Sequence, residues 1–365
     1  MRIALLAPTY WPEVRRGTER VIHDLGVALA ERNHEVTILT THPQRRRETI
    51  EDGVRVVRDR RLPQPPGLAA HEYHLSTLPT TYLRLIRGDF EIAQAFFPTQ
   101  AWAAVKARAR GGPPVVATTH GIPAREYLVA RRNRLEMHLE VCAKAEIVAV
   151  LSKAAADPFE RYFQRRPMVL PGGVVPADFS YHGGRTAHPS LFCASSLGDP
   201  RKRPGLLFRA FERLRDDLPE LTLSVARSHD PFMSGATPEL PEGAQWLELD
   251  GPGEMAAAYG SAWASVNPAI GEAFGLVLVE SLAAGTPVVA DSSGAGPEIV
   301  DDGNGSLFEP DDEDGLVKAV GKALELSQLG ETAAKCRARA ADFDWRHIVE
   351  RYEDVYVRAI EGGVS

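Results

Sequence analysis

Two glutamates separated by seven residues, with a glycine between them, are the residues of this 365-residue chain that most clearly indicate chemistry. Glu272 lies in an expected strand-to-helix loop, and Gly275 permits close approach of a ligand where the next helix begins. The unpaired amides and positive dipole of a helix start attract an anion such as phosphate. Glu280, further along that helix, is placed within reach of polar groups beside such an anion. From the residues alone, an ordinary helix start with a solvated acidic side chain explains the segment equally well.

The elements that must position these residues alternate along the chain. Continuous apolar runs of four to six residues are typical of strands buried on both faces of a parallel sheet. Between them, apolar residues recur at helical spacing, as in 204–214 and 274–284. This pattern predicts an α/β fold of two doubly wound, Rossmann-like domains in tandem, whose ligands bind beyond the carboxyl ends of the strands. The strands are expected at 3–7, 36–40, 54–57, 92–95, 115–119 and 146–151, and then at 191–194, 221–226, 245–249, 264–266 and 287–290.

A stretch rich in glycine and proline, residues 171–184, predicts the linker between the two domains. The expected boundaries are therefore 1–180 for the first domain and 181–344 for the second. The remaining segment, 345–365, contains an amphipathic helix.

Composition excludes several classes of protein. With 44% hydrophobic and 25% charged residues, the chain is neither disordered nor fibrous, and no apolar run reaches the ~18 residues of a membrane span. Three widely spaced cysteines form neither a disulfide framework nor a zinc pair. A net charge of -7, without interleaved basic and aromatic residues, argues against nucleic acid as a partner. We expect a cytoplasmic protein.

The charge is unevenly distributed. Residues 1–180 contain 26 Lys and Arg against 19 Asp and Glu, whereas the rest of the chain contains 16 against 30. Arginines cluster at 45–47, 58–61 and 131–134. Such clusters attract an anionic acceptor or an acidic membrane surface, which here would be the inner face of the membrane. Alternatively, these arginines are simply solvated. Peripheral membrane contact through the first domain is therefore one of the alternatives.

The string from Asn267 to Ala290 resembles the signature of the retaining family 4 glycosyltransferases (glycosyl transferases group 1), which have the GT-B architecture. It contains a proline, the two glutamates with Phe-Gly between them, and then Gly-Thr-Pro-Val-Val. The resemblance extends over nearly the whole chain, with further similar motifs at 8–12, 17–20, 33–37, 119–121, 148–152, 294–300 and 343–345. It implies two Rossmann-like domains that face each other across a cleft, with the last helix crossing back to the first domain.

The resemblance also assigns roles. Lys202, Glu272 and His120 would be catalytic. Lys202 would act as a fixed cation that stabilises the charge developing on a leaving nucleoside diphosphate. The nucleotide and its phosphates would be bound by Gly17, Lys202, Arg203, Gly275, Leu276 and Glu280, and the donor sugar by Glu272, Phe274, Gly275 and His120. Glu280 would accept hydrogen bonds from the ribose.

The implied reaction moves a sugar from a nucleoside diphosphate sugar, with UDP sugars favoured, to an acceptor, with retention and without a metal or other cofactor. Residues 312–314, Asp-Glu-Asp, formally fit a metal motif, but they precede a helix, where acidic residues favour the dipole. The sequence does not identify the acceptor, the base and sugar of the donor, or the oligomeric state.

Some positions depart from the family pattern. Leu197 stands where an arginine is usual, so Arg201 or Arg203 would have to replace that charge, and Ala269 replaces a frequent serine. These departures leave open a non-catalytic relative that binds nucleotide sugars as a regulatory or partner subunit. A nucleotide-sugar epimerase, which shares the architecture, is a further alternative. The sequence argues against a dinucleotide oxidoreductase, because no Gly-x-Gly-x-x-Gly follows the first strand, and against a P-loop nucleoside triphosphatase, because its glycine motif is missing.

Overall fold

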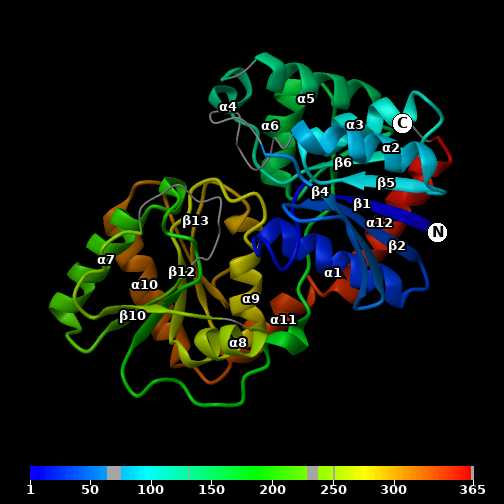
Figure 1. Cartoon of the computed structure of the whole chain (residues 1–365). Helices are drawn as coiled ribbons and strands as arrows, with labels where there is room; N and C mark the ends of the chain where they lie inside the picture. Colours follow the sequence, from blue (N-terminus) through cyan, green and yellow to red (C-terminus); the bar gives the residue numbers. More distant parts are fainter. Residues whose placement is uncertain (64–74, 131, 228–236, 250, 363–365) are drawn as a thin grey trace. The chain divides into compact units, whose positions relative to one another are not determined.

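The structure is a computed structural model that describes residues 1–63, 75–130, 132–227, 237–249 and 251–362 (Figure 1). Its helices and strands form two compact units. Of the described residues, the first unit contains 1–172 and 345–362, and the second contains the remainder of 173–344. The first unit thus ends inside the glycine- and proline-rich stretch, and the helix at the end of the chain belongs to it.

The first unit is built on an eight-stranded sheet in the order β3-β4-β2-β1-β5-β6-β7-β8. Neighbouring strands are parallel except β3 and β4, which pair antiparallel at one edge. The strands are β1 (Arg2–Leu6), β2 (Glu35–His42), β3 (Arg47–Glu51), β4 (Val54–Arg60), β5 (Ile92–Ala95), β6 (Val115–Thr119), β7 (Ile147–Val150) and β8 (Met168–Val169). The helices are α1 (Gly17–Glu31), η2 (Leu75–Thr77), α2 (Leu78–Arg87), α3 (Pro98–Arg108), α4 (Arg125–Val129), α5 (Arg132–Lys144), α6 (Lys153–Phe163) and α12 (Trp345–Ile360).

The apolar run of β1 explains why this sheet is covered on both faces. Alternate residues of a strand point to opposite faces, and Ile3 to Leu6 are all fully buried. Ile3 and Leu5 pack in one core cluster with residues of α1 and α12, whereas Ala4 and Leu6 pack in a second cluster with residues of α3 and α6. The strand therefore has no solvent-facing side, as its composition predicts.

The second unit is built on a six-stranded, wholly parallel sheet in the order β11-β10-β9-β12-β13-β14. Apolar faces of α7 and α10 form its main core cluster with the strands. The strands are β9 (Ser190–Cys193), β10 (Thr222–Ala226), β11 (Ala244–Leu247), β12 (Ala264–Asn267), β13 (Val288–Asp291) and β14 (Gly305–Phe308). The helices are η3 (Pro176–Phe179), η4 (Pro200–Lys202), α7 (Pro204–Asp217), α8 (Pro252–Ser261), α9 (Leu276–Ala284), η5 (Gly296–Glu298), α10 (Glu313–Ser327) and α11 (Thr332–Ala341).

Both sheets reverse their direction of winding once. In the second unit the chain moves from β9 outward to β11, and then returns to pair β12 with the other side of β9. In the first unit the reversal lies between β1 and β5. The loops that leave the carboxyl ends of two such strands diverge and leave room for a ligand. The expected class of two doubly wound α/β units is confirmed.

Some local expectations need correction, and the short strands β8 and β14 were also not predicted. The polar segment Arg47–Glu51 was not predicted as a strand, because its mostly exposed residues lack an apolar run; it is held only at the edge, by β4. The helix expected from Phe274 begins at Leu276. No helix in the part of the chain that the structure describes is long and apolar enough to span a bilayer.

Candidate functional site

Lys202 and Glu272 meet at the point where the second sheet reverses direction. Lys202 ends η4, in the loop that leaves β9, and Glu272 lies in the loop that leaves β12. The Lys202 Nζ atom contacts Glu272 Oε1 in an ion pair. The two side chains are 21% and 23% exposed, so the pair is open to solvent on one side. Strand order, rather than sequence proximity, brings these two charges together.

The main chain of Glu272 is held by the loop that follows β13. Ala295 N donates to Glu272 O at 2.8 Å, and Gly271 N donates to Ser293 Oγ at 3.0 Å. Between these bonds, a Cβ atom on Gly294 would lie 2.5 Å from Glu272 O, a distance that real side chains do not tolerate. The glycine at 294 is therefore required for the close approach that positions Glu272.

The loop that carries Lys202 is braced in a similar way. Asp199 caps η4, since its Oδ1 accepts from Arg201 N at 2.9 Å, and Arg201 O accepts from Ile270 N at 3.1 Å. Burial acts to raise the pKa of Asp199, but hydrogen bonds from Arg201 outweigh it and hold that pKa below its ordinary value. The loops after β9 and β12 are thus joined by a main-chain hydrogen bond.

Each of the two arginines that could replace the missing family arginine has a carboxylate partner other than Glu272. The Arg201 guanidinium donates to Asp199 Oδ2 at 2.6 Å. Arg203 has a left-handed backbone, with φ of 52°, and its guanidinium pairs with Asp311. Lys202 is therefore the member of this basic triplet that pairs with Glu272.

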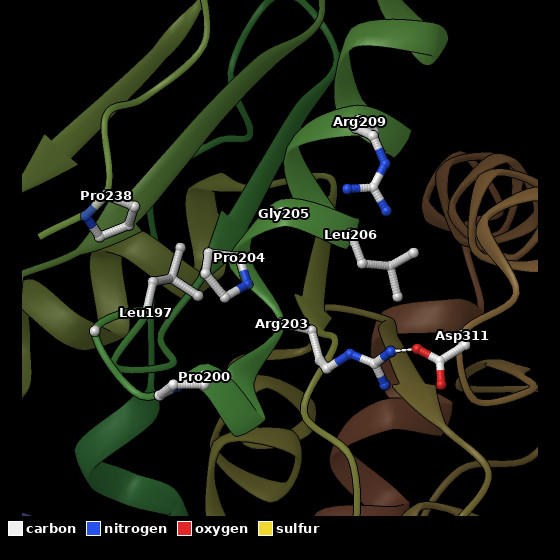
Figure 2. A pocket seen from close by; sticks show the side chains of 10 residues that line it. Leu197, Pro200, Arg203, Pro204, Gly205, Leu206, Arg209, Pro238 and Asp311 are labelled. Carbon is white, nitrogen blue, oxygen red and sulfur yellow. Dashed lines mark ion pairs between the residues drawn. The ribbon is translucent and has the colours of Figure 1, made fainter. Parts of the chain in front are cut away.

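Arg203 and Asp311 lie in the wall of a pocket of about 530 Å³ at the start of α7 (Figure 2). The pocket combines apolar surface with the charged Arg203, Arg209 and Asp311. Its lining consists of Leu197, Gly198, Pro200, Arg203, Pro204, Gly205, Leu206, Arg209, Pro238 and Asp311. Lys202 and Glu272 do not belong to this lining, so the pocket is adjacent to the ion pair but separate from it.

Gly275 sets the start of α9. Its φ of 86° is left-handed, and its carbonyl accepts from Leu278 N at 2.9 Å. The helix therefore begins one residue later, at Leu276, with its first amides at the carboxyl edge of the sheet. Phe274 is 5% exposed and packs edge-on against Phe343, with ring centroids 5.7 Å apart. Its side chain thus anchors the loop in the core of this unit.

Glu280 lies on the face of α9 that packs against α8. It is only 3% exposed, and Tyr259 OH donates to its Oε2 at 2.9 Å. Tyr259 is fully buried. The sequence analysis did not identify Tyr259, because a tyrosine among small residues gives no signal of the carboxylate 21 positions later. We add Tyr259 to the candidate site as a residue that orients Glu280.

The candidate residues of the first unit are uncharged. Gly17 begins α1, and the preceding Arg16 provides no side-chain cap for the helix amides. The loop before it is fixed by two wholly buried residues, because Thr9 Oγ1 donates to Glu19 Oε1 at 3.0 Å. This places the start of α1 beyond the carboxyl end of β1, at the reversal of the sheet.

His120 follows β6 in the same unit. Its ring lies edge-on to Phe96, with centroids 5.4 Å apart, and its Nε2 atom is enclosed without a hydrogen-bond partner among the described residues. Burial lowers the pKa of His120 to about 3, so the imidazole is neutral near pH 7. It can donate or accept a hydrogen bond but carries no charge.

The acidic triplet at 312–314 has a structural role. Asp312 Oδ1 accepts from Gly315 N at 2.8 Å and caps α10, while Glu313 pairs with Arg209 and Arg213. Among the residues that the structure describes, no group of three or more His, Cys, Asp and Glu side chains could hold a metal ion.

Comparisons with known proteins agree with this arrangement. The family model "Glycosyltransferase Family 4" matches residues 15–178, and "Glycosyl transferases group 1" matches residues 188–326. A phosphatidyl-myo-inositol mannosyltransferase of Mycolicibacterium smegmatis is 25% identical, over 100% of this chain and 96% of its own length. An MMP alpha-(1->4)-mannosyltransferase of Mycolicibacterium hassiacum is 29% identical, over 99% of this chain and 98% of its own.

Solved structures show the same fold. Sucrose-phosphate synthase from Thermosynechococcus elongatus superposes with a TM-score of 0.83 at 20% identity, covering 99% of this chain and 100% of that one. Anabaena HepE in complex with UDP-glucose superposes with a TM-score of 0.73 at 18% identity, covering 98% and 99%. Since the two family models together take in most of the sequence, the chain belongs to the family 4 glycosyltransferases and has the GT-B fold.

Proposed function

We propose that this glycosyltransferase transfers a sugar from a nucleoside diphosphate sugar with retention of anomeric configuration, and that it needs neither a metal nor another cofactor. The observation that carries the proposal is the Lys202–Glu272 pair at the reversal of the second sheet, beside the start of α9. A cation and helix amides suit a diphosphate, and a carboxylate suits sugar hydroxyls.

The candidate catalytic residues have distinct roles in this reaction. Lys202 and the amides of Gly275 and Leu276 stabilise the charge that develops on the leaving diphosphate. Glu272 accepts hydrogen bonds from sugar hydroxyls and offsets positive charge at the reacting carbon. The neutral imidazole of His120 hydrogen-bonds the sugar near that carbon without adding a charge.

The nucleotide part of the donor is bound by the remaining groups. Glu280, oriented by Tyr259, accepts hydrogen bonds from the ribose hydroxyls. The amide of Gly17 adds an uncharged donor to the phosphates. UDP sugars are the favoured donors, and the HepE complexes with UDP and UDP-glucose support this choice. Several relatives are named as mannosyltransferases, so GDP-mannose is the first competitor to be tested.

For the acceptor we propose an inositol that carries a phosphate. Relatives named phosphatidyl-myo-inositol mannosyltransferase and D-inositol 3-phosphate glycosyltransferase share this chemistry. The excess of arginine and lysine in residues 1–180 suits an anionic acceptor of this kind. A free inositol phosphate and an inositol phospholipid are the two forms to be compared.

Peripheral membrane contact is part of the same proposal for the lipid form. The short helix α4 exposes Tyr127 and Val129, which are 37% and 55% accessible, close in sequence to Arg125 and Arg132. Apolar side chains beside arginines suit an anionic bilayer surface. Arg131, which the sequence analysis placed in this cluster, lies outside the described residues. Val129→Asp should weaken co-sedimentation with anionic vesicles, whereas neutral vesicles should not bind either form.

The deciding experiment is turnover with a panel of donors. UDP-, GDP- and ADP-sugars are incubated in EDTA, each with and without inositol phosphate or inositol phospholipid, and the products are analysed by NMR. Retained configuration at the new glycosidic bond supports the proposal, and inverted configuration or loss of activity in EDTA contradicts it. Binding without turnover across the panel would indicate a non-catalytic relative. A new sugar isomer without acceptor would indicate an epimerase.

A further inference from the structure

We propose that the Lys202–Glu272 ion pair is exchanged on donor binding and distinguishes the intact donor from the bare nucleoside diphosphate. The inference rests on the proposed function, because it assigns the donor diphosphate to Lys202 and the donor sugar to Glu272. It adds a property that those two roles do not contain: the site prefers its substrate to its product.

The first step is that the two side chains satisfy each other in this structure. Lys202 Nζ and Glu272 Oε1 are in direct contact, and each side chain is about one-fifth exposed. Asp199, a second carboxylate near Lys202, is already bonded to the Arg201 guanidinium at 2.6 Å. Glu272 is therefore the counter-ion of Lys202, and any phosphate that binds the lysine must compete with it.

The second step is that the loops hold the pair in place. Ile270 N donates to Arg201 O at 3.1 Å, which links the residues next to Lys202 with those next to Glu272. On the far side, Ala295 N donates to Glu272 O at 2.8 Å. Because both backbones are braced, the exchange requires only that the two flexible side chains change partners.

The third step concerns charge. A diphosphate that takes over Lys202 leaves the Glu272 carboxylate without its cation and close to new negative charge, which is unfavourable. The sugar of an intact donor compensates for this, since its hydroxyls donate hydrogen bonds to the carboxylate. The bare diphosphate offers no such donor. Intact donor is thereby favoured over diphosphate, and after transfer Glu272 recovers Lys202 and promotes product release.

The test is a comparison of Glu272→Gln with the wild-type protein by calorimetric titration of UDP and GDP, and of the corresponding donor sugars without acceptor. Glutamine keeps the shape but removes the charge that competes with phosphate. We expect the affinity for the nucleoside diphosphate to rise by about fivefold, as for loss of a partly exposed ion pair. The affinity for the intact donor should fall or stay constant, so that the preference for donor over product is lost.

Two further variants control the measurement. Glu331→Gln breaks the exposed Lys335–Glu331 pair of α11, whose atoms are 2.6 Å apart, and should leave both affinities unchanged. Glu272→Asp keeps the charge but shortens the reach, and should raise the diphosphate affinity less than glutamine does. If Glu272→Gln does not fold, as judged by thermal unfolding, the aspartate variant decides alone.

The outcomes separate the two proposals. Unchanged or weaker diphosphate binding in both Glu272 variants overturns the exchange while leaving the proposed function intact. A wild-type protein that binds neither nucleoside diphosphates nor their sugars overturns the proposed function itself. Tighter product binding with a retained donor preference would also overturn the exchange, because the carboxylate would then not be the group that discriminates.

Discussion

The carboxyl edges of the two sheets both hold a reversal of winding, but the candidate residues there differ in charge. In the second unit, the reversal between β9 and β12 holds a lysine and a glutamate in direct contact. In the first unit, the candidate residues are the backbone of Gly17 and a histidine whose pKa burial lowers to about 3. In the proposed reaction, the edge of the second unit binds the charged diphosphate and the edge of the first unit supplies uncharged hydrogen-bonding groups.

The largest effect should come from the charged edge. Lys202→Ala removes the cation that we propose meets the leaving diphosphate, and turnover should fall by about 2–4 kcal/mol of transition-state stabilisation, roughly 30- to 1000-fold. Steady-state rates with a saturating donor measure this. Lys335→Ala, an exposed lysine of the same unit, is the matched control and should keep the wild-type rate. An unchanged rate for Lys202→Ala would remove the contrast between the two edges.

A smaller effect is expected at the uncharged edge. His120→Ala removes a neutral hydrogen-bonding group, and kcat should fall about tenfold, as for loss of ~1.4 kcal/mol. Because burial holds the pKa of His120 near 3, this histidine should cause no inflection in the kcat of the wild type between pH 5 and 8. An inflection that is present in the wild type and absent in the variant would mean that the imidazole is charged in the working enzyme, and the two edges would be electrostatically alike.

Tyr259→Phe tests how the second unit orients its buried carboxylate. Loss of the 2.9 Å hydrogen bond to Glu280 should cost about 1 kcal/mol, raising KM for the donor roughly fivefold with little change in kcat. Tyr162→Phe, at a 36% exposed position, serves as the control. If the variant instead loses kcat and folding stability while KM for the donor stays unchanged, Tyr259 only supports the core.

The smallest effect concerns His23, a histidine of the first unit that differs from His120. Burial opposes its protonation, but the hydrogen bonds that its ring nitrogens donate to Asp24 and Asp52 outweigh burial and raise the pKa of His23. Its contribution to stability is therefore complete below pH 6.5 and is lost as the pH rises through the raised value. Denaturant unfolding from pH 5 to 9 should show a decrease of about 0.2–1 kcal/mol that is missing in His23→Asn.

His188→Asn, which changes a 59% exposed histidine of the second unit, provides the comparison for that measurement. If the wild type and His23→Asn lose stability in parallel above pH 6.5, the two carboxylates do not hold the proton on His23. His120 has the opposite sign: its lowered pKa withdraws stability as the pH falls from about 6.5 toward 3.

Local patterns in the sequence were sufficient for most of the fold. The buried run of β1 and the helix Trp345–Ile360 are each visible in a short window, because strand and helix periodicity depend only on neighbouring residues. The motif with Glu272 and Glu280 and the basic triplet with Lys202 were likewise recognisable from residue type and spacing. The polar edge strand β3 was not, since its pairing with β4 rather than its own residues makes it a strand.

The amino-acid sequence by itself thus determined the alternation of strands and helices, the family, and which residue types are available for chemistry. Only the tertiary structure decided which of these residues are partners. Lys202 pairs with Glu272, 70 positions away, because β9 pairs with β12 as well as with β10. Arg203 pairs with Asp311, which lies in the loop that follows β14. Tyr259 reaches Glu280 because α8 packs on α9. Such contacts depend on the order of strands in the sheet, which no local pattern specifies.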